Sequence, residues 1–251
     1  MQLFRTLDDG WGLSGVLYHY GYGVQRFGAY ADAVPLLEEA IQVAAAAGVH
    51  NTVQWATADL GLALLALGRI EEASACFARA GAVSEKVGDH AGQALATYGD
   101  ALMAARQGNH ARARPLFETA CGALEALGVW LATGLALAGV ADSYARLGRP
   151  DLAAAGYARL LQLAETTGEA SLLCLALEGS ARTVVGQDPA RAAAMLGRAA
   201  QLRVEYDRPQ TEAEREVAAS AALAARQALG DTAYEVAARA GAELGLGGGP
   251  A

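Results

Sequence analysis

Four histidines and three cysteines are the side chains of this chain best suited to metal binding or nucleophilic chemistry. They are His19, His50, His90, His110, Cys76, Cys121 and Cys174. No HExxH or CxxC spacing occurs among them, so neither ligand pattern of a zinc site is present. Sparse cysteines in an odd number are typical of reduced, buried thiols in a cytoplasmic protein. The sequence therefore predicts no metal site and no nucleophile with its base.

Two further patterns resemble catalytic or cofactor motifs. Glu38-Glu39 and Glu71-Glu72 are adjacent acids, but neighbouring side chains on a helix diverge and make no acid–base couple. The segment Gly10–Gly15 fits the GxGxxG pattern, which binds a dinucleotide only when a strand precedes it. A helix end precedes it here, so we interpret the segment as a turn and helix start. We expect no catalytic residue, no cofactor and no enzyme activity.

Composition limits the partners and the compartment. The chain has 251 residues, a formal net charge of −8 and no run of Lys or Arg, which argues against direct nucleic-acid binding. The longest apolar stretch, Val129 to Ala141, is shorter than the roughly 20 residues that span a membrane, and no signal-peptide pattern opens the chain. We expect a cytoplasmic protein with no membrane contact. Its alanine- and leucine-rich sequence favours helix.

The sequence is organised by a repeat of 40 residues, which positions its histidines, cysteines and acids. Two sets of glycines share this spacing, and the second set follows the first by 20 residues. The sets are Gly28, Gly68, Gly108 and Gly148, and Gly48, Gly88, Gly128 and Gly168. Each glycine follows a helical stretch and can end it in a left-handed conformation. The chain is therefore predicted to alternate helices of roughly 17 residues with tight turns.

Columns of small and bulky residues run through the repeat. The small column is Ala33, Ala73, Ala113 and Ala153; the bulky column is Leu37, Phe77, Phe117 and Tyr157; a second small column is Ala40, Ala80 and Ala120, with Leu160 in the fourth unit. Earlier in each unit come Gly21, Gly61, Ala101 and Ala141. This order resembles the tetratricopeptide-repeat (TPR) family, with longer helices than the usual 34-residue unit and without its usual proline. The resemblance implies an all-α, right-handed α–α superhelical solenoid with C-terminal capping helices.

The repeat divides the chain as follows. We expect the end of a truncated repeat helix (1–9), five helix pairs over 10–206 (10–48, 49–88, 89–128, 129–168 and 169–206), capping helices (207–244) and a flexible tail (245–251). Phe4 and Leu7 match Leu124 and Leu127 three periods later, so the chain is expected to begin within a longer array. An uncapped N-terminal end predicts a possible homodimer.

In the TPR family the first helix of each pair lines the concave face, where a peptide binds. The resemblance places ten residues there. They are Tyr18, Tyr22, Trp55, Leu62, Tyr98, Leu102, Asp142, Arg26, Arg106 and Arg146. The tyrosines favour the groove because a phenol prefers one wet end. For the column of Trp55, with Leu95 and Leu135, the groove and inter-repeat core interpretations both stay open. The arginines could clamp a carboxylate, but the dipole of a helix end explains them more simply.

The C-terminal quarter carries a second, looser resemblance. Asp188-Pro189-Ala190-Arg191, the run to Ala200, Arg208-Pro209 and the closing Leu229-Gly230-Asp231 are similar to the end of TPR sections in large bacterial regulators of actinobacterial type. Those proteins join a DNA-binding domain of antibiotic-regulatory or LuxR type to an ATPase. The resemblance implies a signalling role in transcription regulation, with neighbouring domains as partners. A free-standing scaffold or adaptor and a small-molecule receptor are the alternatives.

Overall fold

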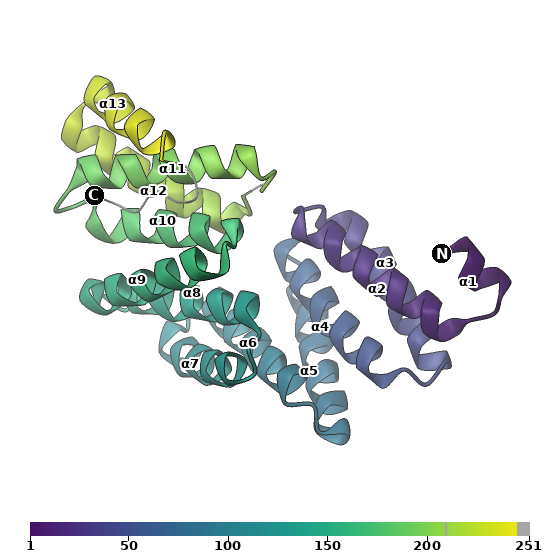
Figure 1. Cartoon of the computed structure of the whole chain (residues 1–251). Coiled ribbons are helices and arrows are strands. Elements are labelled where there is room, and N and C mark those ends of the chain that lie inside the picture. The colour runs from purple at the N-terminus through teal and green to yellow at the C-terminus, as the bar shows by residue number, and fades with distance from the viewer. Residues whose placement is uncertain (209, 245–251) are drawn as a thin grey trace.

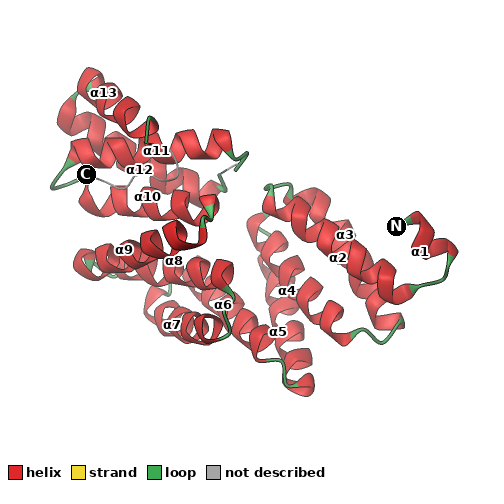
Figure 2. Ribbon diagram, viewed as in Figure 1, coloured by secondary structure: helices red, strands yellow, loops and turns green. Residues whose placement is uncertain are grey.

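The computed structural model describes residues 1–208 and 210–244, and every regular element within them is a helix (Figures 1 and 2). The helices of the first three pairs are α2 (Gly10–Arg26), α3 (Tyr30–Ala46), α4 (His50–Ala66), α5 (Ile70–Val87), α6 (His90–Arg106) and α7 (His110–Ala126). The next two pairs are α8 (Trp130–Arg146), α9 (Pro150–Thr167), α10 (Ala170–Val184) and α11 (Pro189–Glu205). A short helix, α1 (Gln2–Thr6), precedes them, and α12 (Glu212–Leu229) and α13 (Asp231–Ala242) follow. Successive helices pack in order, so the predicted all-α solenoid is confirmed.

The turn glycines take the conformation that their spacing predicts. All eight have φ between 68° and 77°, the left-handed region in which a Cβ atom is disfavoured. After each of them the next helix begins two residues later, and after two of them Asp89 and Asn109 cap that helix by accepting a hydrogen bond from its first turn. Asp9 and Asp188 cap α2 and α11 in the same way, after turns that lack these glycines. The predicted role of the glycines is confirmed.

The ring in the bulky column of α5, α7 and α9 enters a gap on the next first helix. A Cβ atom on Gly99 would lie 2.4 Å from the ring of Phe77, and one on Gly139 would lie 2.6 Å from the ring of Phe117. Gly179 meets the ring of Tyr157 in the same way, at 2.1 Å. Rings from one hairpin thus fill glycine gaps in the following hairpin, which lets the helices pack closely.

The buried core of the described residues falls into two large clusters and one small one. The first large cluster holds buried residues of α2 to α5 together with Met103 of α6. The second begins at Ala94 of α6 and continues to Ala221 of α12, and the small cluster joins Ala193, Ala225 and Tyr234. The junction between α5 and α6 is therefore the place where one core ends and the next begins. Figure 1 shows the two groups of helices as separate arms of a bent array.

The C-terminal helices close the array without repeating its pattern. Thr211 caps α12 in a reciprocal capping box with Glu214, as its sequence predicts. The N-cap of α13 is Gly230, and Asp231, the first residue of the helix, accepts a hydrogen bond from Arg226. Helix α13 packs chiefly on α11. The predicted tail lies outside the described residues.

At the N-terminal end, α1 lies against the start of α2, where Phe4 covers Gly12. Leu3, Leu7 and Trp11 are exposed there. No helix within the described residues has both the length and the apolar character that a membrane crossing requires.

Candidate binding face

The first helices of the pairs lie beside one another and form one continuous face. Each of α2, α4, α6 and α8 contacts the next first helix of the series. Residues 40 apart on these helices therefore become neighbours on this face, which we call the inner face. Figure 1 shows the second helices α5, α7 and α9 on the outer side of the bend.

The apolar residues predicted for this face are half-buried. Leu62 and Leu102 pack against the buried core, as do Leu95 and Leu135. Trp55, in the same column as Leu95 and Leu135, is also half-buried. These side chains present part of their surface to the inside of the solenoid and use the rest for packing between repeats.

The three predicted tyrosines differ in their surroundings. Tyr98 is 7% exposed, and its ring packs on Phe117 with 5.7 Å between ring centroids, so it belongs to the core. Burial raises its pKa, and the nearby Glu214 and Tyr30 add to the effect. Tyr18 and Tyr22 are half-buried on α2, with ring centroids 6.2 Å apart. Of the three predicted tyrosines, these two therefore keep part of the side chain exposed on the inner face.

A buried carboxylic acid that sequence reasoning missed lies beside Tyr18. Asp59 of α4 is 8% exposed. Burial raises its pKa to about 7, and a hydrogen bond with Tyr18 opposes that rise. Burial, together with Asp59, also raises the pKa of the Tyr18 phenol. This pair is thus a site where a proton is held near neutral pH.

The three predicted arginines lie in different surroundings. Arg26 contacts Glu169, the residue that precedes α10, with 3.1 Å between its Nη2 and the carboxylate, and it also reaches the Tyr22 hydroxyl at 3.4 Å. Arg106 and Arg146 are exposed at the ends of α6 and α8. The structure therefore separates Arg26, which is engaged within the chain, from two arginines at the solvent edge.

Asp142 lies beside a cavity between α8, α10 and α12. Arg182 donates to Asp142 at 2.6 Å and to the Tyr157 hydroxyl at 3.1 Å. The cavity has a volume of about 300 Å³. Its lining residues are Ala145, Arg146, Arg182, Glu216, Val217 and Ser220. The carboxylates of Asp142 and Glu216 offset the two guanidinium groups, so the cavity is close to charge-balanced.

The predicted columns end at the fourth pair, and two charged residues continue them in the fifth pair. Ala138 lies 40 residues after Tyr98, and adding 40 to Ala138 and to Asp142 gives Glu178 and Arg182. Both lie on α10, and Glu178 is 3% exposed. The 40-residue register could have found them, because it holds through α10, where Gly179 continues the column of Gly99 and Gly139.

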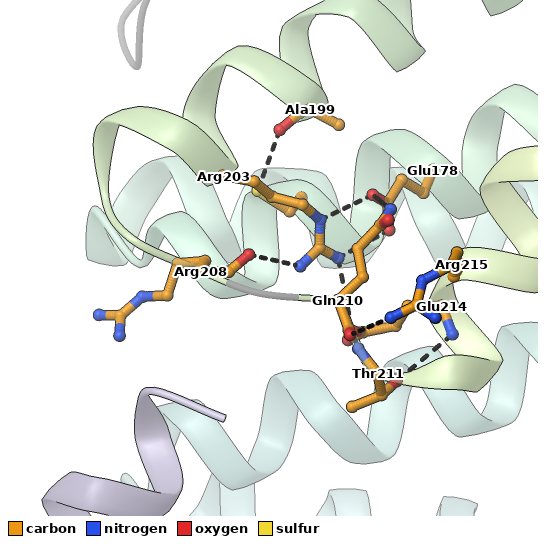
Figure 3. Close-up of polar contacts among 9 residues, drawn as sticks. Glu178, Ala199, Arg203, Arg208, Gln210, Thr211, Glu214 and Arg215 are labelled. Carbon is orange, nitrogen blue, oxygen red and sulfur yellow. Dashed lines mark hydrogen bonds and ion pairs between the residues drawn. The ribbon is translucent and has the colours of Figure 1, made fainter. Parts of the chain in front are cut away.

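Glu178 is the centre of a polar network at the C-terminal end of the face (Figure 3). Its two carboxylate oxygens accept hydrogen bonds from Nε and Nη2 of Arg203, each at 2.8 Å, and one of them also accepts from Gln210. Arg203 further donates to the carbonyl of Arg208 at 3.2 Å and lies 3.6 Å from Glu214. Burial lowers the pKa of Arg203, but the bonds and charge of Glu178 outweigh it and raise that pKa overall.

This network ties the start of α12 to α10 and α11. Gln210 and Glu214 come from the α12 side, Glu178 from α10 and Arg203 from α11 (Figure 3). Helix α12 therefore covers the position of Glu178, which by register belongs to the inner face. The C-terminal end of that face is occupied by the chain's own helix.

Comparison with known families agrees with this architecture. Residues 52–126, from α4 to α7, match the family model of the tetratricopeptide repeat. No curated protein matches the sequence. The match spans less than a third of the chain, and the remaining hairpins continue the same period and packing. The matched segment and the sequential helix packing together support a tetratricopeptide-repeat family and show a TPR-like α-solenoid.

Proposed function

We propose that this chain is a non-catalytic module that binds a protein or peptide segment along its inner face. The supporting observation is the row of half-buried apolar and aromatic groups on adjacent first helices, above all Trp55, Tyr18 and Tyr22. Aromatic side chains with one exposed edge supply contact area at low entropic cost and often dominate binding energy. TPR folds commonly act as interaction modules, which agrees with this role.

Selection of a random peptide library against the immobilised chain tests the proposal. We expect selected peptides to bind with an affinity that Trp55→Ala or Tyr22→Ala lowers about tenfold, which is about 1.4 kcal/mol. Trp130→Ala is the matched control, because Trp130 is 48% exposed at the start of α8 and lies outside the inner columns. Peptides whose affinity depends on Trp130 and not on Trp55 or Tyr22 would place binding elsewhere and contradict the proposal.

We further propose a finer role as the sensor or regulatory arm of a bacterial transcriptional regulator. The support is the resemblance of the segment from Asp188 to Tyr234, which corresponds to α11, α12 and the start of α13. Sequencing the parent gene on both sides of these codons tests it. An ATPase and a DNA-binding domain in the same reading frame would support the regulator, and an open reading frame confined to these codons would favour a free-standing scaffold.

The predicted homodimer stays a proposal with a test of its own. The exposed Leu3, Leu7 and Trp11 at the N-terminal end are the surface that it would use. Light scattering coupled to gel filtration should give a dimer mass that falls to the monomer in Trp11→Glu. A monomer at all accessible concentrations would contradict it.

A further inference from the structure

The two ends of the repeat array meet across the inside of the bend. Arg26 and Phe27, at the turn after α2, face Glu169 before α10 and Arg208 between α11 and α12. These contacts join residues 143 and 182 positions apart in the sequence. Figure 1 shows the α2–α3 turn directed towards the connection between α11 and α12. We call these four residues the clasp.

Three different interactions make up the clasp. The Arg26 guanidinium and the Glu169 carboxylate are 3.1 Å apart. Arg208 donates from Nη1 to the carbonyl of Arg26 at 3.3 Å, which satisfies one of the carbonyls left unpaired at the end of α2. The Arg208 guanidinium also lies 5.3 Å from the centroid of the Phe27 ring, within range of a cation–π interaction.

Charged groups behind the clasp also act electrostatically on the other arm. Glu214 at the start of α12 raises the pKa of Tyr30 at the start of α3, after the larger effect of burial, while Arg203 lowers it. Glu214 acts in the same direction on Tyr98 of α6, which belongs to its own arm. The polar network around Glu178 therefore faces Tyr30 of the first helix pair across the gap, and the clasp lies at its edge.

The clasp is weakly supported by packing. Within the described residues, neither α2 nor α3 packs helix against helix on α10, α11 or α12. The side chains of Arg26 and Glu169 are 23% and 34% exposed, so water and salt reach the pair. The Nε of Arg208 is buried without a hydrogen-bond partner in the described part of the chain. Such contacts can close and open without unfolding either arm.

The junction between α5 and α6 lies between the two arms. The two large core clusters divide near it, although Phe77 of α5 packs into the Gly99 gap of α6 and Met103 of α6 belongs to the N-terminal cluster. At the same junction Gly81 of α5 faces Ala96 of α6, where a Cβ on the glycine would lie 3.2 Å from that of the alanine. Rotation of one arm on the other would therefore turn around the Phe77 ring, while the Gly81–Ala96 contact has no large side chains to interlock.

We propose that the clasp is a salt-sensitive latch that holds the two arms closed over the inner face and opens about the α5–α6 junction to admit a partner segment. The admission of a partner rests on the proposed binding function, whereas the closing and opening do not. Closure lowers the apparent affinity for a partner, because only the open fraction of molecules accepts one. Weakening the latch raises that fraction.

Distance measurement between spin labels at Asp32 and Glu212 tests the latch without any ligand. Both positions are exposed, one on each side of the clasp, whereas Cys76, Cys121 and Cys174 are buried and react slowly. We expect a narrow distribution at low salt. Glu169→Arg should lengthen and broaden it, because a third guanidinium then faces Arg26 and Arg208. The double variant Arg26→Glu with Glu169→Arg should restore it by reversing the pair.

Salt and a second label pair complete the test. Raising the salt from about 0.05 M to about 0.5 M shortens the screening length several-fold and should lengthen the distance in the unmodified chain. Labels at Arg112 and Glu212, both on the C-terminal arm, should show no change in any variant. An unchanged 32–212 distance in Glu169→Arg and at high salt would overturn the latch. A changed distance with an unchanged rate of peptide association would leave the latch standing and remove its role in binding.

Discussion

Two buried carboxylic acids on the first helices have opposite surroundings at the two ends of the array. Glu178 on α10 accepts hydrogen bonds from Arg203 and Gln210, so its charge is matched within the fold. Asp59 on α4 faces the phenol of Tyr18, which carries no positive charge, and burial raises the pKa of this acid to about 7. The guanidinium partner holds Glu178 in an ion pair within the fold, whereas Asp59 exchanges its proton near neutral pH.

One column of the repeat explains how Asp59 is accommodated, and Glu178 lies in the neighbouring column. Positions 40 apart on the first helices hold His19, Asp59, Gly99, Gly139 and Gly179. The three glycines receive the rings of the preceding second helices, Phe77, Phe117 and Tyr157. In the pair before Asp59 the corresponding residue is Leu37, which has no ring. The repeat can therefore hold an acid at this one position, where the later repeats need a glycine.

The largest expected effect comes from removing the partner of Glu178. Arg203→Met leaves a carboxylate buried beside an apolar side chain, and we expect it to lower the free energy of unfolding by about 3–5 kcal/mol. Urea denaturation followed by circular dichroism measures the loss. The double variant Glu178→Gln with Arg203→Met removes both charges and should recover much of it. Equal losses in the single and double variants would contradict the ion-pair explanation.

A smaller effect tests the column that holds Asp59. Gly139→Ala puts a methyl group where the Phe117 ring lies, and overpacking of this kind costs about 1–3 kcal/mol. Gly122→Ala is the matched control, because that glycine lies within α7 with open space beside it, and it should stabilise the chain by up to about 1 kcal/mol. Thermal unfolding of both variants gives the comparison. A neutral Gly139→Ala would show that the ring moves freely.

The glycine spacing predicted the fold because it reports a local property. Gly28, Gly88 and Gly168 end helices in the left-handed region. The preference for glycine at such a position can be recognised in a single sequence without any tertiary information. The start of α12 was predicted for the same reason, because the capping box of Thr211 and Glu214 is local as well.

The polar partners could not be predicted because they depend on distant parts of the chain. Glu169 meets Arg26 only through the curvature of the whole array, and Arg203 meets Glu178 only because α11 returns along α10. The hydroxyl group of Tyr98 led us to expect this residue in the groove, yet its ring packs on Phe117. The column alone could not show this, because it does not report how deeply a side chain is buried. Periodicity gives the face of a helix, while charge pairing requires the fold.

The most delicate prediction concerns the protonation of Asp59. Its pKa is 3.8 ordinarily and about 7 in the folded chain, so between these values the folded state binds a proton that the unfolded state has released. The resulting contribution to stability is complete below about pH 4 and is lost as the pH rises through about 7. We therefore expect the unmodified chain to gain about 1 kcal/mol per pH unit over Asp59→Asn as the pH falls from 7 to 5. Denaturant unfolding of both chains at several pH values gives this difference, in which the other acids cancel. A difference independent of pH would mean that Asp59 is charged in the folded chain, and the contrast with Glu178 would then be lost.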